Sequence, residues 1–116
     1  MSAVLEKVDR IGSLFELYGD LLTPRQKELT MLYYFDDLSL AEIAEELGIS
    51  RQAVFFGLKR SEEILEGYEE TLGLFEKSLL QKSKLEEVQE LMKKYRGSGD
   101  TGHLDMAEAL LDSLLD

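Results

Sequence analysis

Three helix starts, each marked by its own capping residue, constrain this chain more than any other feature of its sequence. The tetrapeptides Thr-Pro-Arg-Gln at 23–26 and Ser-Leu-Ala-Glu at 39–42 both have the pattern of a capping box. Ser50 supplies a third cap, two residues after Gly48, where a left-handed helix end is expected. These positions predict a helix from Pro24, a short helix from Leu40 that closes at Gly48, and a further helix from Arg51.

Apolar residues recur at helical spacing on both sides of these caps. Val4, Val8, Ile11, Phe15 and Tyr18 follow one another at steps of four and three, which predicts an amphipathic helix from about residue 3 to residue 18. No segment has the strict alternation of a half-buried strand. We therefore expect an all-α fold.

The helix from Pro24 is expected to bury Leu29, Leu32 and Tyr33 and to end at Phe35-Asp36-Asp37. Asp36 and Asp37 are better explained as a helix-ending turn than as a metal pair, because no further ligand lies at a suitable spacing.

A heptad-like apolar stripe follows the helix start at Arg51. Its members are Leu65, Tyr68, Leu72, Phe75 and Leu79. The stripe then changes phase, so we expect a break or kink at residues 81–83. Such a stripe needs a cover, which is either residues 1–60 of the same chain or a second copy in a homodimer.

Glycine marks the C-terminal part of the chain. Gly97-Ser98-Gly99-Asp100 predicts a flexible linker over 97–102. Residues 103–116 are then expected to form a short amphipathic helix, with Leu104, Ala107, Leu111 and Leu114 on one face and Leu110 and Leu115 widening it. We expect residues 1–60 to form an N-terminal helix and a helix pair, and residues 61–96 to form a helical extension that packs on them in the same domain. The linker and the terminal helix follow. Because a helix this short is marginally stable alone, it must dock on the rest of the chain, on another protomer or on a partner.

Acidic residues dominate the chain, whose net charge is -11. Residues 1–50 carry four basic and ten acidic side chains, and residues 61–116 carry six and fourteen. Residues 51–60 instead hold Arg51, Lys59 and Arg60 and no acid. The overall excess of acidic residues argues against nucleic-acid binding. The location of the basic segment 51–60 (the basic decade), at the start of the predicted helix from Arg51, argues for it.

Several function classes have no support in the composition. Cysteine is absent, His103 is the single histidine, and no residues assemble a nucleophile, a base and an oxyanion donor. We expect no enzyme activity, no cofactor and no metal site. The N-terminus lacks the pattern of a signal peptide and no apolar run reaches the roughly 18 residues that span a bilayer, which favours a cytoplasmic protein.

Residues 39–60 meet the requirements of a helix-turn-helix. Ala44 is the small residue before the turn, Gly48 is the turn glycine, and Val54 and Leu58 fall on the inner face of the second helix. The candidate nucleic-acid-binding residues are the outward ones on that second helix: Ser50, Arg51, Gln52, Phe55, Phe56, Lys59 and Arg60. Arg and Gln are base-edge readers, and Lys59 and Arg60 suit phosphates. We expect one of the two phenylalanines to turn toward the core.

Longer stretches of the chain resemble region 4 of bacterial sigma factors. They read Leu-Leu-Thr-Pro-Arg-Gln at 21–26, Leu-Tyr-Tyr-Phe at 32–35 and Leu-Ser-Leu-Ala-Glu-Ile-Ala-Glu-Glu-Leu-Gly-Ile-Ser-Arg-Gln-Ala-Val at 38–54. Leu-Phe-Glu-Leu-Tyr at 14–18, Lys-Arg-Ser-Glu at 59–62 and Tyr-Glu-Glu-Thr-Leu-Gly-Leu-Phe at 68–75 are more similar to the YlxM family, also called UPF0122 or p13-like. The resemblance covers roughly residues 4–95, and the linker and terminal helix lie outside the common pattern.

The resemblance implies a small all-α protein: a sigma region 4-like helix-turn-helix bundle with a long C-terminal helical extension. It also implies a regulatory role beside the signal recognition particle, because the family's genes neighbour those of the particle protein and its receptor. The family's DNA-contact stretch falls on Ser50, Arg51, Gln52, Lys59 and Arg60. Phe55-Phe56-Gly57 departs from the pattern, in which a tyrosine is followed by polar residues.

Two functions therefore stand side by side. In the first, the module binds DNA, or the particle's RNA, and regulates. In the second, it is a protein-interaction module that docks a partner of the targeting machinery through Phe55 and Phe56 or through the terminal helix.

Overall fold

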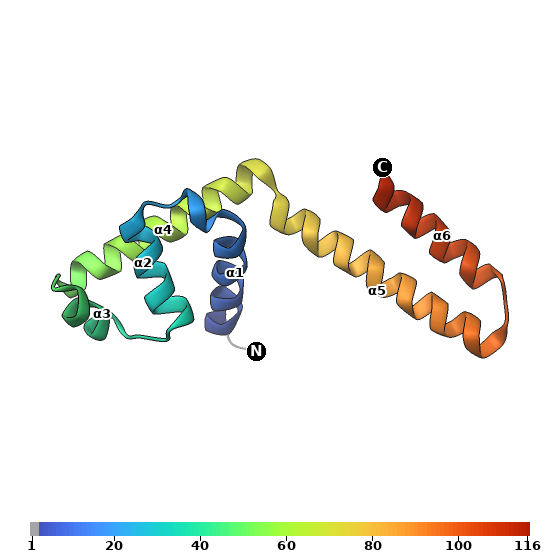
Figure 1. Ribbon diagram of the computed structural model, residues 1–116, viewed down its shortest axis with the longest axis horizontal. Helices are drawn as coiled ribbons and strands as arrows, with labels where there is room; N and C mark the ends of the chain where they lie inside the picture. Colours follow the sequence, from blue (N-terminus) through green and yellow to red (C-terminus); the bar gives the residue numbers. More distant parts are fainter. Residues whose placement is uncertain (1–2) are drawn as a thin grey trace. The chain divides into compact units, whose positions relative to one another are not determined.

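The computed structural model describes residues 3–116, with side chains from Glu6 onward, so Val4 of the predicted first stripe lies outside the described side chains. All regular elements in this range are helical (Figure 1). The α-helices are α1 (Ala3–Tyr18), α2 (Pro24–Thr30), α3 (Leu40–Leu47), α4 (Arg51–Leu72), α5 (Leu74–Ser98) and α6 (Gly102–Leu115). A 3-10 turn, η1 (Gly19–Leu21), follows α1, and a π-helical turn, η2 (Met31–Phe35), follows α2. The all-α prediction is confirmed.

The chain divides into two compact units, Met1–Phe75 and Glu76–Asp116. The division falls within the extension at 61–96 that the sequence suggests is one piece. Within the described residues, no helix combines the length and the apolar character needed to cross a membrane.

The predicted caps are present in the first unit. Thr23 accepts a hydrogen bond from the Gln26 N–H while the Gln26 side chain accepts one from the Thr23 N–H, so both halves of the capping box form. Ser39 and Glu42 do the same at α3. These contacts satisfy donors that a helix start leaves open, which explains why the sequence located both starts correctly.

Two clusters form the core of the first unit. One joins α1 to α4 through Ile11, Leu14, Tyr18, Leu22 and Leu65. The other wedges α2, α3 and α4 together through Leu29, Ile43, Ala44, Val54 and Leu58. Five of these side chains are fully buried: Leu14, Tyr18, Ile43, Val54 and Leu65.

Tyr33 is exposed, so its predicted burial is wrong. The reason is the π-helical turn η2, in which the Asp36 N–H donates to the Met31 carbonyl. A π-turn takes one more residue than an α-turn and rotates the following side chains. Tyr34 therefore packs against both core clusters in place of Tyr33. Asp37, at φ 59°, then reverses the chain.

The predicted break at residues 81–83 is also wrong, because α5 runs through them without interruption. The break lies at Gly73, whose left-handed backbone (φ 62°) ends α4. The buried Glu69 carboxylate accepts the Phe75 N–H at 3.0 Å and the Tyr18 hydroxyl at 2.7 Å, and that hydroxyl accepts the Leu74 N–H at 3.2 Å. Side chains from α1 and α4 thus satisfy the first donors of α5.

This break also ends the predicted continuous stripe from Leu65 to Leu79. Leu65 is buried in the first unit, whereas Leu72 and Leu79 are about half exposed. The packing partner of the apolar residues changes along α5: Phe75 still packs against the cluster of α1, whereas Val88 and Leu91 pack against Ala107 of α6.

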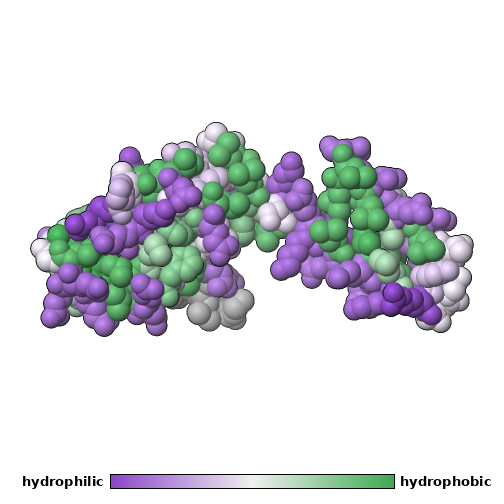
Figure 2. All heavy atoms as spheres, viewed as in Figure 1, coloured by the Kyte–Doolittle hydropathy of each residue, from purple (hydrophilic) through white to green (hydrophobic). Residues whose placement is uncertain are grey.

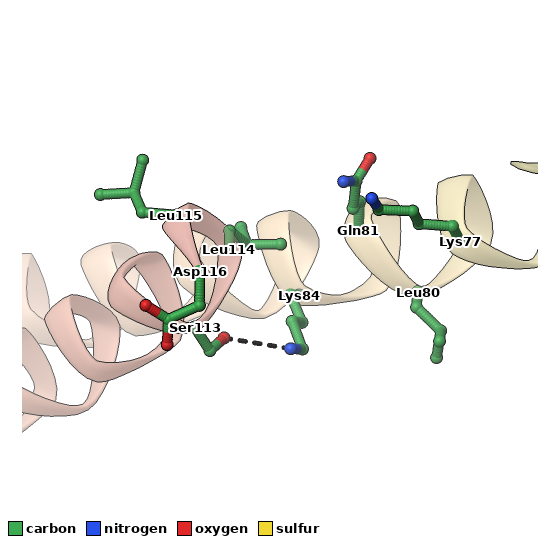
Figure 3. Close-up of a pocket in the computed structure, with 8 residues that line it drawn as sticks. All are labelled: Lys77, Leu80, Gln81, Lys84, Ser113, Leu114, Leu115 and Asp116. Atoms are coloured by element: carbon green, nitrogen blue, oxygen red, sulfur yellow. Dashed lines mark hydrogen bonds between the residues drawn. The ribbon is translucent and has the colours of Figure 1, made fainter.

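The second unit is a hairpin in which α6 returns alongside α5 (Figure 1). Its core consists of Val88, Leu91 and Ala107, with Leu110 packed against them. Lys84 donates to the Ser113 hydroxyl at 3.0 Å beside a hollow of about 450 Å³ where α6 ends (Figure 3). Leu111, expected on the docking face of α6, is 41% exposed, because Leu110 takes its place against α5.

The glycine-rich segment between α5 and α6 is a hydrogen-bonded turn. Gly99 is left-handed at φ 71°, the Ser98 hydroxyl accepts the Asp100 N–H, and the Asp100 carboxylate accepts the Gly102 N–H at 2.9 Å. Local polar contacts of this kind fix the reversal of chain direction.

Candidate nucleic-acid interface

The helix pair α3–α4 is held by its turn and by its inner face. Gly48 is left-handed, at φ 68° and ψ 34°, and the Ile49 N–H donates to the Ala44 carbonyl at 3.1 Å. Ala44 is buried where the two helices cross, and Val54 is fully buried on the inner face of α4. The helix-turn-helix predicted from residues 39–60 is confirmed as a fold.

The start of α4 is presented to solvent. Ser50 is committed to the cap, because its hydroxyl accepts the Ala53 N–H at 3.0 Å. Arg51 and Gln52 occupy the first turn and are exposed. Lys59 and Arg60, two turns further along, are exposed as well. The structure thus places Arg51, Gln52, Lys59 and Arg60 on one helix, α4, with Ser50 as its cap.

Phe55 and Phe56 are both exposed, at 47% and 63%, so the expectation that one turns inward is wrong. Their rings meet edge to face, with centroids 5.4 Å apart, and the Lys59 ammonium lies 5.9 Å from the centre of the Phe55 ring. The inner face of α4 is already filled by Val54 and Leu58, which lie one position before Phe55 and two after Phe56. A rotation of about 100° per residue leaves no room there for either ring.

The rotation of about 100° per residue along α4 also places the basic residues on different sides of the helix. Gln52, Phe56 and Lys59 project from the middle of the exposed face of α4, whereas Arg51 and Arg60, nine residues apart, fall about half a turn from each other. Arg60 also lies 3.8 Å from Glu63. In the part of the chain that the structure describes, neither Arg51 nor Lys59 forms an ion pair.

The acidic residues that follow on α4 are held by α1. Glu62 accepts a hydrogen bond from the Tyr34 hydroxyl at 2.8 Å and pairs with Lys7 at 2.9 Å. Glu66 receives two guanidinium nitrogens of Arg10, the shorter contact being 2.7 Å. The hydrogen bonds and charge of Glu66 raise the pKa of Arg10, and burial followed by the hydrogen bond to Glu62 raises the pKa of Tyr34.

These pairs change the local charge of the surface. Two of the carboxylates next to the basic decade are neutralised by cations from α1, so the first turns of α4 are less acidic than the net charge of the chain suggests. A shallow hollow of about 320 Å³ lies over this seam, lined by both α1 cations and by Lys59.

Lys7 and Arg10 are the residues that the sequence did not reveal as part of this surface. Their spacing on α1, and that of Glu62 and Glu66 on α4, places each pair on one helix face. Arg10 and Glu66 lie 56 residues apart, and helical spacing within each segment does not say which faces meet. No group of three or more metal-ligating side chains converges in the described residues.

Comparisons with known proteins place the chain in a family. Residues 5–101 match the family described as "Putative helix-turn-helix protein, YlxM / p13 like". A UPF0122 protein of Lactococcus lactis subsp. cremoris (strain MG1363) is 54% identical over 91 residues, which cover 78% of this chain and 79% of the relative. A UPF0122 protein of Bacillus pumilus (strain SAFR-032) is 46% identical over 110 residues, covering 95% and 94%.

The two kinds of match differ at the C-terminus. The family pattern stops one residue before α6, whereas an alignment that covers 95% of the chain, as with the Bacillus pumilus protein, has to extend into α6. The sequence of the terminal segment is therefore aligned, at least in part, in one relative. The helix-turn-helix geometry, the extent of the family match and the identity to these relatives together show that the chain belongs to the UPF0122 family of YlxM/p13-like helix-turn-helix proteins.

Proposed function

We propose that this protein binds double-stranded DNA through the first two turns of α4 and acts as a regulator. The observation that carries the proposal is the exposed start of α4, where Arg51 and Gln52 stand at the N-terminus of the second helix of a helix-turn-helix. In such modules the N-terminal residues of the second helix read base edges in the major groove. Arg reads guanine and Gln reads adenine.

Duplex DNA is favoured over duplex RNA by groove shape. The major groove of B-form DNA admits an α-helix, whereas that of A-form RNA is too narrow for side-chain reading. Lys59, whose ammonium lies 5.9 Å from the centre of the Phe55 ring, is a further cation of this face and is assigned to a phosphate. With so few cations, we expect modest affinity and a shallow dependence on salt, since each neutralised phosphate adds about 0.9 to the slope of log K against log salt.

The proposal includes a place in the signal recognition particle pathway. Its support is the family membership of the chain together with the gene neighbourhood that the family resemblance implies. The regulated genes would then be those of the particle protein and its receptor.

Fluorescence anisotropy with labelled duplex DNA tests the proposal, using fragments from upstream of the targeting genes and a scrambled duplex. Arg51→Ala should weaken binding about tenfold and lower the preference for the specific duplex, because a bidentate base contact is worth about 1–3 kcal/mol. Lys94→Ala removes the same charge from an exposed position on α5 and serves as the matched control. Equal binding by wild type and Arg51→Ala would refute the assignment.

A second candidate function rests on a separate observation, the exposed Phe55–Phe56 pair. Aromatic side chains are enriched in protein interfaces, and two adjacent exposed phenylalanines are costly in water without a partner. This function is docking to a protein of the targeting machinery. A pull-down with the particle protein should then depend on Phe56 and not on Arg51, and binding should change little between low and high salt. Deletion of residues 100–116 tests whether α6 takes part.

A homodimer also belongs to the proposed function. The continuous stripe at Leu65–Leu79 cannot supply its surface, because Gly73 divides that stripe and Leu65 is buried.

A further inference from the structure

The second unit is too small to account for its own stability. It comprises about 40 residues, Glu76–Asp116, in two helices, and chains of that size ordinarily need a disulfide, a metal or an oligomeric partner. Cysteine is absent from the chain. Only Val88, Leu91 and Ala107 are buried in its core. A hairpin with so few buried side chains needs a further apolar cover.

One face of the hairpin offers the surface for that cover. Leu85 and Met92, seven residues apart on α5, are about half exposed, and Leu111 and Leu115, four apart on α6, are 41% and 85% exposed. At about 100° per residue, each pair lies to one side of the line of contact between the helices. Because α5 and α6 run antiparallel, both pairs lie on the same side. Figure 2 shows apolar side chains gathered over α6. We call these four residues the hairpin face.

Charged residues flank the hairpin face with opposite sign on its two edges. The α5 edge carries three cations, Lys82, Lys93 and Arg96, and one acid, Glu86, and is therefore basic on balance. Lys93 also lies 3.8 Å from Glu90 of the same helix. The α6 edge carries Asp105, Glu108 and Asp112, all exposed. The helix α6 contains no lysine or arginine, so its edge is uniformly acidic. The hairpin face is therefore an apolar strip between a basic edge and an acidic edge.

We infer that the hairpin face binds the hairpin face of a second copy of this chain, forming an antiparallel four-helix bundle. A two-fold axis parallel to the helices sets α5 of one copy opposite α6 of the other and buries both apolar strips. Each basic edge then meets an acidic edge, twice in the dimer. The alternative two-fold axis, across the helices, sets α5 against α5 and brings like charges together. The charge pattern thus selects both the occupant and its orientation.

This interface is independent of the DNA-binding proposal, because its residues lie in the second unit and the α4 site lies in the first. Loss of dimerisation and loss of DNA binding are measured separately, so one can fail while the other holds.

Sedimentation equilibrium of the full chain tests the inference. The chain of 13.2 kDa should sediment at twice that mass at about 50 µM protein, a concentration at which micromolar dimers are populated. Leu111→Glu should raise the dimer dissociation constant roughly tenfold or more, because a charge replaces a buried leucine at each of two symmetric positions. Lys94→Glu, on the opposite side of α5, should leave the mass unchanged. A monomeric wild type at this concentration would overturn the inference.

Charge exchange tests the orientation without altering any apolar contact. Lys82→Glu with Lys93→Glu should weaken the dimer, since two acidic edges then face each other. Adding Asp105→Lys and Asp112→Lys to the same chain should restore it, because the edges are again opposite in sign. An α5-against-α5 dimer would show neither the weakening nor the restoration. Far-UV circular dichroism of each variant checks that the hairpin is still helical, and failure to restore the dimer in a folded quadruple variant contradicts the proposed arrangement.

Discussion

The two units of this protein are built from the same kind of amphipathic helix and differ in what covers it. In the first unit, α1, α2, α3 and α4 bury one another around Leu14, Ile43, Val54 and Leu65, all fully inaccessible. In the second, α5 and α6 share three buried residues and leave Leu85, Met92, Leu111 and Leu115 at the surface. Helical periodicity is present in both, so periodicity alone does not report a complete core.

This difference predicts unequal roles for polar contacts as well. The first unit satisfies buried polar groups across long stretches of sequence, as in the contact from Tyr18 to Glu69. The polar contacts of the second unit are exposed, including Lys84 to Ser113. The first unit should therefore unfold cooperatively, whereas the second should depend on its partner.

The largest expected effect comes from the core of the first unit. Leu14→Ala should destabilise it by about 2–5 kcal/mol, because it removes a fully buried side chain and leaves a cavity. Leu17→Ala, on the same helix but 44% exposed, is the matched control and should change stability by much less. Urea denaturation followed by circular dichroism measures both.

A core substitution in the second unit should affect that unit alone. Leu91→Ala should increase hydrogen exchange in α5 and α6 and leave the exchange of α1–α4 unchanged. If hydrogen exchange rises equally in both units, the two units unfold together and are not independent in stability.

A smaller effect is expected at the start of α5. Glu69→Ala removes the acceptor of both the Tyr18 hydroxyl and the Phe75 N–H and should cost about 1–3 kcal/mol, the penalty of a buried group without a partner. Glu70→Ala alters the exposed neighbour and should be nearly neutral. If both substitutions have the same effect on the urea midpoint, the carboxylate of Glu69 does not secure the helix start.

Two glycines of α4 should respond in opposite directions. A methyl group at Gly67 meets no atom within 4 Å, so Gly67→Ala should stabilise the chain by about 1 kcal/mol through helix propensity. A methyl group at Gly57 would lie 2.5 Å from the buried Leu29 side chain. The steric clash should outweigh the gain in helix propensity, so Gly57→Ala should destabilise the chain by about 1 kcal/mol or more in total. Thermal denaturation of the two variants decides whether the close approach of α2 and α4 requires Gly57.

The smallest effect near neutral pH concerns Tyr34, and it grows in alkali. Burial, followed by the hydrogen bond to Glu62, raises the pKa of this tyrosine, so the hydroxyl stays protonated in the folded state after it ionises in the unfolded chain. Its contribution is present below pH 10 and is lost as the pH rises above that value. Tyr34→Phe should therefore make stability fall less steeply above pH 10, whereas Tyr33→Phe, at an exposed position, should follow the wild type.

Much of the fold could be predicted because its signals are local. The starts of α2, α3 and α4 follow from Thr23, Ser39 and Ser50, whose side chains bond to backbone groups three residues away. The break at Gly73 was harder to predict, because a glycine inside a helical pattern is compatible with either a helix interior or a left-handed end. Contacts made by Tyr18 of α1 and by Glu69, in the last turn of α4, decide between the two.

Some features of the candidate site also follow from local signals in the sequence, whereas others depend on long-range packing. Local signals in the sequence suffice to predict a capped helix pair at residues 39–60, with Arg51 and Gln52 in the exposed first turn of its second helix. The packing of the helices is needed to show that Phe55 and Phe56 both face solvent, that α1 neutralises Glu62 and Glu66, and that α6 leaves an apolar strip uncovered. Capping is a contact between near neighbours in the chain, whereas exposure and ion pairing depend on which helix faces meet, a choice made by long-range packing.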